Sequence, residues 1–270
     1  MITKDSVKLL LEDGRTHRKQ FSVNSGIQKN KPRPTFSVPF DNGLLRHFRD
    51  GTGLFLKWNP DHDQHYCFLQ DQSKIDVAEG WEVAQGTRVF IRNLMSSSLA
   101  LDINLVDNTS GKKTHTGLLE EQAKHHQDQK SIAELVRISV ETVKSISYLQ
   151  ECDVLMAVPA MLNKGFDLPR ELAKGISTGI GKPNMTPNFL LEGKQGSAKA
   201  VDLSQKWDVW ASCLFRYDGS SLARRRVMLV DDKYQSGVTM QFWAAELLKM
   251  GASEAHGLSM VKTLRDTDNQ

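Results

Sequence analysis

The sequence predicts an α/β protein whose C-terminal part is a doubly wound parallel sheet, preceded by a small β-rich N-terminal domain. Two apolar runs, Asp153–Pro159 and Val227–Val230, have the length of buried parallel strands, and each leads through a polar loop into a helical pattern. Between Gly53 and Val106, short apolar segments recur at close spacing, which is typical of a small antiparallel sheet or barrel.

Length and composition indicate an ordinary globular protein. The 270 residues suggest two domains, and the net charge of +3 argues against a dedicated nucleic-acid coat but not against a local basic patch. The three cysteines form neither a zinc-spacing pair nor a disulfide framework. No run approaches transmembrane length and the N-terminus has no apolar signal region, so we expect a cytoplasmic protein with no membrane contact.

The N-terminal part begins with Ser6–Leu11, a helical turn or strand, followed by a basic arm at Gly14–Arg33. This arm is either solvated or in contact with a nucleic-acid backbone. The segment Asp61–His65 contains residue types that bind metals. In an extended segment, however, His62 and His65 would point to opposite faces, so a polar hairpin tip is the better interpretation. Strands are expected at Leu54–Trp58, His65–Leu69, Trp81–Val83, Arg88–Ile91 and Leu99–Val106.

A polar, glycine-containing linker at Asn108–Thr116 is the candidate domain boundary. It divides the chain into residues 1–112, a β-rich domain with the basic arm, and residues 113–270, the α/β domain. A helical pattern follows over Leu118–Leu149, amphipathic in its second half and more hydrophilic in its first, which suggests a separate exposed helix there. A last strand is expected at His256–Val261.

The stretch Val227–Met240 combines features that suit a sugar phosphate. Asp231 and Asp232 follow the strand, and a short polar turn, Lys233–Gly237, leads into a helical pattern from Val238 to Met250. A helix N-terminus binds anions through free N–H groups and its dipole, while two carboxylates can hold ribose hydroxyls or a divalent metal. Two solvated acids at an ordinary turn are the alternative. A receiver domain does not fit, because only about forty residues remain, enough for roughly one further strand–helix–strand unit.

This stretch resembles the phosphoribosyl-diphosphate (PRPP) motif of type I phosphoribosyltransferases: an apolar strand, two acids and a small-residue loop ending Gly-x-Thr. The resemblance implies that Asp231 and Asp232 bind the ribose hydroxyls. It also implies that the loop Gln235, Ser236, Gly237, Val238 and Thr239 holds the 5-phosphate. The chain departs from the usual pattern at Lys233, Tyr234 and Gln235. These departures bear on which substrate is bound and on whether it is turned over.

A second segment is similar to the ComF-like (amidophosphoribosyltransferase-like) branch of that family, through Val158-Pro159, Lys164-Gly165-Phe166 and Glu171-Leu172-Ala173. The resemblance implies a pyrophosphate loop with Lys164 as its cation, unless Lys164 is simply a solvated lysine; the loop comprises Ala160, Met161, Leu162, Asn163 and Lys164. The glycine- and lysine-containing stretch Gly193–Ala200 suits a mobile segment that closes over the sugar, and an ordinary surface loop is the alternative.

The resemblance covers residues 118–270 and implies an enzyme of nucleotide metabolism. It would bind PRPP with Mg²⁺ and transfer the phosphoribosyl group to an acceptor, releasing pyrophosphate, with Asp231, Asp232 and Lys164 as catalytic residues. One alternative is a catalytically reduced nucleotide sensor or single-stranded-DNA-associated protein that uses the basic arm. Another is a defence or toxin effector in which the N-terminal domain binds a protein partner or a second copy.

Overall fold

The computed structural model describes residues 1–30, 32–160, 165–192, 201 and 203–264. Its main feature is a six-stranded sheet in the order β1-β6-β7-β12-β11-β8. The four strands β7, β12, β11 and β8 are parallel, whereas β6 and β1 extend the sheet in antiparallel pairing. Its strands are β1 (Arg18–Gln20), β6 (Val89–Ile91), β7 (Ser97–Ile103), β8 (Val154–Ala157), β11 (Arg226–Tyr234) and β12 (Glu254–Lys262).

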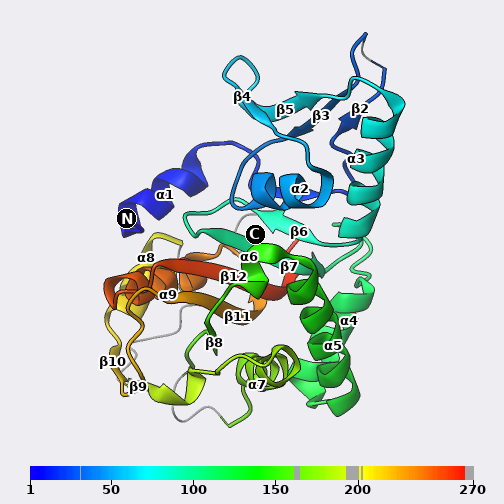
Figure 1. Ribbon diagram of the computed structural model, residues 1–270. Coiled ribbons are helices and arrows are strands. Elements are labelled where there is room, and N and C mark those ends of the chain that lie inside the picture. Colours follow the sequence, from blue (N-terminus) through cyan, green and yellow to red (C-terminus); the bar gives the residue numbers. More distant parts are fainter. Residues whose placement is uncertain (31, 161–164, 193–200, 202, 265–270) are drawn as a thin grey trace.

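Helices cover both faces of this sheet, because its central strands are apolar on both sides. Along β11, Met228 and Val230 belong to one hydrophobic cluster, while Val227 and Leu229 belong to another. Figure 1 shows the two helical layers on either side of the sheet. The first cluster includes residues of α4 (His115–His126), α5 (Gln129–Ser145), α6 (Ser147–Gln150) and α7 (Leu168–Ile180). The second includes residues of α1 (Lys4–Glu12), α8 (Leu203–Ala211) and α9 (Val238–Lys249).

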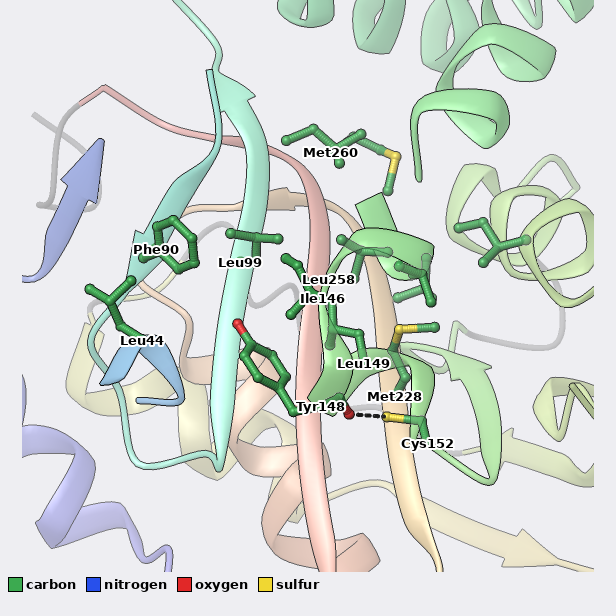
Figure 2. Packing of buried hydrophobic residues seen from close by; sticks show 14 of the residues in the cluster. Leu44, Phe90, Leu99, Ile146, Tyr148, Leu149, Cys152, Met228, Leu258 and Met260 are labelled. Atoms are coloured by element: carbon green, nitrogen blue, oxygen red, sulfur yellow. Dashed lines mark hydrogen bonds between the residues drawn. The ribbon is translucent and has the colours of Figure 1, made fainter. Parts of the chain in front are cut away.

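The first cluster also joins the two halves of the chain. Figure 2 shows the segment Ile146–Cys152 lying across Leu258 and Met228, near Leu99 and Phe90 of the N-terminal half. The thiol of Cys152 lies 3.6 Å from the carbonyl oxygen of Tyr148. Because these side chains are almost completely buried, the parallel sheet and the strands that precede it share one core.

A second, smaller sheet lies beside the main one (Figure 1). It is antiparallel, with strand order β2-β3-β5-β4, and its inner side packs on two helices through Phe36, Phe48 and Trp81. These elements are β2 (Ile27–Gln28), β3 (Thr35–Val38), α2 (Leu44–Thr52), β4 (Lys57–Asn59), β5 (Gln64–Phe68) and α3 (Gln72–Gln85). The remaining elements are the 3₁₀ turn η1 (Thr186–Asn188) and the hairpin strands β9 (Phe189–Glu192) and β10 (Leu214–Tyr217).

The predicted fold class is confirmed: a doubly wound α/β sheet accompanied by a small antiparallel sheet in the N-terminal region. The hairpin around Asp61–His65 is also confirmed, because β4 and β5 pair across it. The predicted strand Trp81–Val83 is wrong, since these residues lie in α3. Asp71 caps that helix by accepting a bond from the Lys74 amide, and apolar positions Ile75, Ala78 and Trp81 fall at helical spacing.

The predicted domain boundary after residue 112 falls between elements of a single sheet. Strand β7, which precedes that position, pairs in parallel with β12 near the C-terminal end of the described chain, from Ser97 opposite His256 to Ile103 opposite Lys262. The division into 1–112 and 113–270 stays a prediction. None of the helices in the described ranges has the length and apolarity needed to cross a bilayer.

Candidate functional site

The acids Asp231 and Asp232 lie near the carboxyl end of β11, as the sequence predicts, but the strand is longer than expected. It continues to Tyr234, and Lys233 and Tyr234 stand opposite Val261 and Lys262 of β12. Tyr234 is 4 % exposed and packs in the second hydrophobic cluster. This burial explains why the polar residues at the end of β11 remain part of the sheet. The predicted turn is therefore confined to the residues that follow Tyr234.

Helix α9 begins immediately after that turn. Gly237 is its N-cap and has φ of 76°, the left-handed region that favours glycine. A methyl group on Gly237 would collide with the Tyr234 hydroxyl, so glycine is required for space as well as for backbone conformation. Gly237 has no side chain to cap this helix terminus, and the Val238 N–H donates only a long 3.5 Å hydrogen bond to the Ser236 hydroxyl. The amide N–H groups of its first turn and the positive end of the helix dipole therefore mark an anion-binding position.

The predicted phosphate loop is more tightly packed than its polar sequence suggests. Gln235 is exposed, whereas Ser236 and Val238 are buried. The Thr239 hydroxyl accepts a 3.0 Å hydrogen bond from the indole N–H of Trp210 in α8. Helix α8 thus holds the first turn of α9, a contact that no local pattern in the sequence indicates.

The Asp232 carboxylate forms an ion pair with a residue that the sequence reasoning missed. Lys124 of α4 places its ammonium nitrogen 2.6 Å from Asp232 Oδ2 and 3.5 Å from Glu120 Oε1. Lys233 pairs with the other oxygen of Glu120 at 3.1 Å. Glu120 is 2 % exposed, so α4 is not the exposed helix we expected; it packs against β7 and β12. The Glu120–Lys124 spacing of four residues was the available signal.

These contacts set the charge states of the site. Burial raises the pKa of the Asp231 carboxyl well above its ordinary value of 3.8, and the neighbouring Asp232 carboxylate raises it further, with Lys124 acting in the opposite direction. Burial is the largest single influence on Lys124 and lowers its pKa, but Asp232, Glu120 and Asp231 together outweigh burial, so the pKa of the ammonium group is raised. The site therefore combines a carboxyl group whose pKa is raised with the ion pair of Asp232 and Lys124.

The second predicted loop starts at the same edge of the sheet. Strand β8 pairs with β11 up to Ala157 opposite Val230, and Ala160 follows it, partly exposed. The predicted pyrophosphate-loop residues Met161, Leu162, Asn163 and Lys164 lie outside the described residues, as does the predicted mobile segment Gly193–Ala200. Asp167, at the N-cap of α7, is buried, and its charge adds to the raised pKa of Asp231.

Cations of the N-terminal basic arm make contacts within the chain. Arg15 pairs with Asp13 at 2.9 Å, Arg18 donates to the Leu264 carbonyl, and Lys29 pairs with Glu79. Lys19 is buried and donates to the Asn24 carbonyl. Nucleic-acid binding by this arm stays a prediction.

No family model matches the sequence, and no curated protein matches it. Solved structures similar to this one include an adenine phosphoribosyltransferase from Leishmania tarentolae, at 12 % identity and a TM-score of 0.37, covering 61 % of this chain and 91 % of that one. A purine phosphoribosyltransferase from Pyrococcus horikoshii has 16 % identity and a TM-score of 0.33, covering 50 % and 82 %. A hypothetical protein from Neisseria gonorrhoeae with bound ppGpp has 16 % identity and a TM-score of 0.35, covering 53 % and 73 %. Each TM-score is below 0.5, so we take nothing about function from these proteins.

Proposed function

We propose that this protein binds PRPP or a related ribose 5-phosphate at the carboxyl end of β11 and transfers the phosphoribosyl group with release of pyrophosphate. One observation carries the proposal: the N-terminus of α9, whose N-cap residue is a glycine without a side chain, begins at Val238, six positions after Asp232. An anion position and two carboxylates at that separation match a ligand that carries a phosphate and vicinal hydroxyls on one ring.

In this proposal the amides of Gln235–Thr239 hold the 5-phosphate, and Asp231 and Asp232 hold the ribose hydroxyls. The Lys124 ion pair involves Asp232 Oδ2, so it would fix the carboxylate with Oδ1 directed to a hydroxyl. Lys164 is assigned to the pyrophosphate on sequence grounds. Substitution at the anomeric carbon breaks its bond to pyrophosphate and forms a bond to the acceptor through an oxocarbenium-like transition state, which positioned dipoles stabilise.

The residues of this site could contact a magnesium ion that is held mainly by the ligand. Among the described residues, no cluster of three or more acids, histidines or cysteines is placed to hold a metal by itself. The ion would therefore be carried by the pyrophosphate oxygens of PRPP, where it neutralises their charge. Asp231, which has no ion-pair partner among the described residues, is the carboxylate we assign to contact it, directly or through water.

The test is isothermal titration of Mg²⁺ and PRPP into the wild type, Asp231→Asn and Asp232→Asn. We expect at least a tenfold loss of affinity in each variant, because each loses a charge-assisted hydrogen bond, worth roughly 1.5–3 kcal/mol. Asp61→Asn, on the exposed β4–β5 turn, is the matched control and should bind as the wild type does. Wild-type affinity in both site variants would remove the proposal.

A second candidate function is a nucleotide sensor that binds the ligand without turnover. The specific observation in its favour is the ion pair between Asp232 and Lys124, which occupies one oxygen of a carboxylate assigned to the ribose. Pyrophosphate release measured over a panel of purine and pyrimidine bases separates the two candidates. Binding with release supports the transferase, whereas binding without release over the whole panel supports the sensor.

A further inference from the structure

The small sheet has an outer face that is chemically unlike its inner face. Side chains alternate along a strand, and directly paired residues share a face. The inner side contains Phe36 and Val38, which are buried against α2 and α3; in Figure 1, α2 lies beneath the sheet and α3 runs along its side. By the strand registers, the opposite side consists of Gln28, Thr35, Ser37, Lys57, Asn59, Gln64, Tyr66 and Phe68, which we call the outer face. Its two β3 residues, Thr35 and Ser37, are buried, so the accessible part of this face lies over β2, β4 and β5.

The composition of the outer face restricts what can bind it. In the four described strands, this face has two aromatic residues, one lysine and five uncharged polar residues, with no carboxylate and no aliphatic side chain. Aromatic residues are also enriched at protein–protein interfaces, so the charge of this face, rather than its aromatic content, selects the class of partner. The absence of carboxylates leaves its charge positive, which suits a polyanion.

The two aromatic residues are placed side by side on the central strand β5. Tyr66 and Phe68 are two positions apart, with ring centroids 5.3 Å apart and planes at 81°. Phe68 is 45 % exposed, and the Arg33 guanidinium lies over its ring at 5.8 Å from the centroid. Lys57, which stands opposite Tyr66 on β4, is exposed. Aromatic rings next to cations on an open sheet are the combination that takes up unpaired bases and their phosphates.

We propose that the outer face binds single-stranded nucleic acid, with bases stacked on Tyr66 and Phe68 and phosphates near Arg33 and Lys57. Paired bases in a duplex cannot present their flat faces to the rings, so single strands are the form that fits. This site lies on a different sheet from the sugar-phosphate site and does not depend on the function proposed for it.

The test is fluorescence anisotropy with labelled oligothymidine and oligouridine of about 12 nucleotides, within known single-strand site sizes, using the full chain. We expect binding by the wild type, and a loss of affinity of about 5- to 100-fold in Phe68→Ala and in Tyr66→Ala, the range produced by loss of one stacked base. Phe68→Tyr should bind as the wild type does. Each of Arg33→Gln and Lys57→Gln should reduce the slope of log affinity against log salt by about 0.7.

Trp58→Ala is the matched control, because Trp58 is an exposed aromatic residue of the same hairpin on the inner side. Its affinity should stay within twofold of the wild type, and so should that of Asp231→Asn, which alters only the other site. If Phe68→Ala proves unstable in thermal melts, Phe68→Leu and the variants of the two exposed cations, Arg33→Gln and Lys57→Gln, replace it in the test.

The proposal is overturned if the wild type binds neither oligonucleotide at low salt. It is also overturned if Trp58→Ala loses as much affinity as Phe68→Ala, or if the cation variants leave the salt slope unchanged. Preference for oligothymidine or oligouridine identifies the strand as DNA or RNA.

Discussion

Replacing Lys124 by methionine should destabilise the protein through two acids that this lysine serves. Its ammonium nitrogen lies 2.6 Å from Asp232 and 3.5 Å from Glu120, and the side chains of these three residues are 24 %, 10 % and 2 % exposed, respectively. Methionine has a similar length and keeps the packing of the aliphatic stem. The change therefore removes mainly the charge, leaving Asp232 without its cation and Glu120 with Lys233 alone.

Removal of one partner from a buried ion pair costs about 3–5 kcal/mol, and the partial exposure of Lys124 places the expected loss near the lower end, about 3 kcal/mol. For a chain of this size, that loss lowers the melting temperature by roughly 6–10 °C. Thermal unfolding followed by circular dichroism, together with urea titration, measures both quantities. Lys130→Met, at an exposed position near the start of α5, is the control and should melt within about 1 °C of the wild type.

The double variant Lys124→Met/Asp232→Asn provides the stricter comparison. Because it removes the uncompensated charge along with its partner, it should recover part of the lost stability, and the cycle isolates the coupling between the two residues. A Lys124→Met variant as stable as the wild type, or a double variant less stable than Lys124→Met, would refute the view that this ion pair organises the end of β11.

Two further predictions concern the same strand and loop. Because burial raises the pKa of Asp231, its contribution to stability is fully present below its unfolded value of 3.8 and is lost as pH rises through the folded value. Asp231→Asn should accordingly raise the melting temperature at pH 8 relative to the wild type, with a smaller difference at pH 4; equal differences at the two pH values would contradict the raised pKa. Gly237→Ala should cost more than the roughly 1–2 kcal/mol of a left-handed alanine, because its methyl also meets Tyr234. Gly181→Ala, at φ of 68° with open space around it, isolates the backbone part, and urea unfolding should show a larger loss for Gly237→Ala.

The strand–turn–helix unit at β11 and α9 was predictable because its signals are local. Four consecutive apolar residues specify a strand buried on both faces, and the helical pattern after Gly237 specifies α9. The extension of β11 through Lys233 and Tyr234 was not predictable in the same way. It depends on pairing with β12 and on the space that receives the tyrosine ring.

The errors in the N-terminal half have a similar origin. The sequence predicts a strand within α3 because the apolar residues of this helix are few, and their helical spacing is clear only once the inner side of the small sheet is known. Helix α2 was missed; it starts at a left-handed glycine without a side-chain cap among the described residues and ends at another glycine. Tertiary packing on Phe36 and its neighbours outweighs these weak local signals.

The sequence by itself determined the fold class, the central strands and the start of α9, where we propose an anion position, because these depend on patterns within about ten consecutive residues. Only the tertiary structure decided that β6 and β7 belong to the main sheet, that Lys124 meets Asp232, and that Tyr66 and Phe68 share an open face. Such contacts join residues far apart in the chain or depend on strand register. They are fixed when the whole core is packed, and no local pattern encodes them.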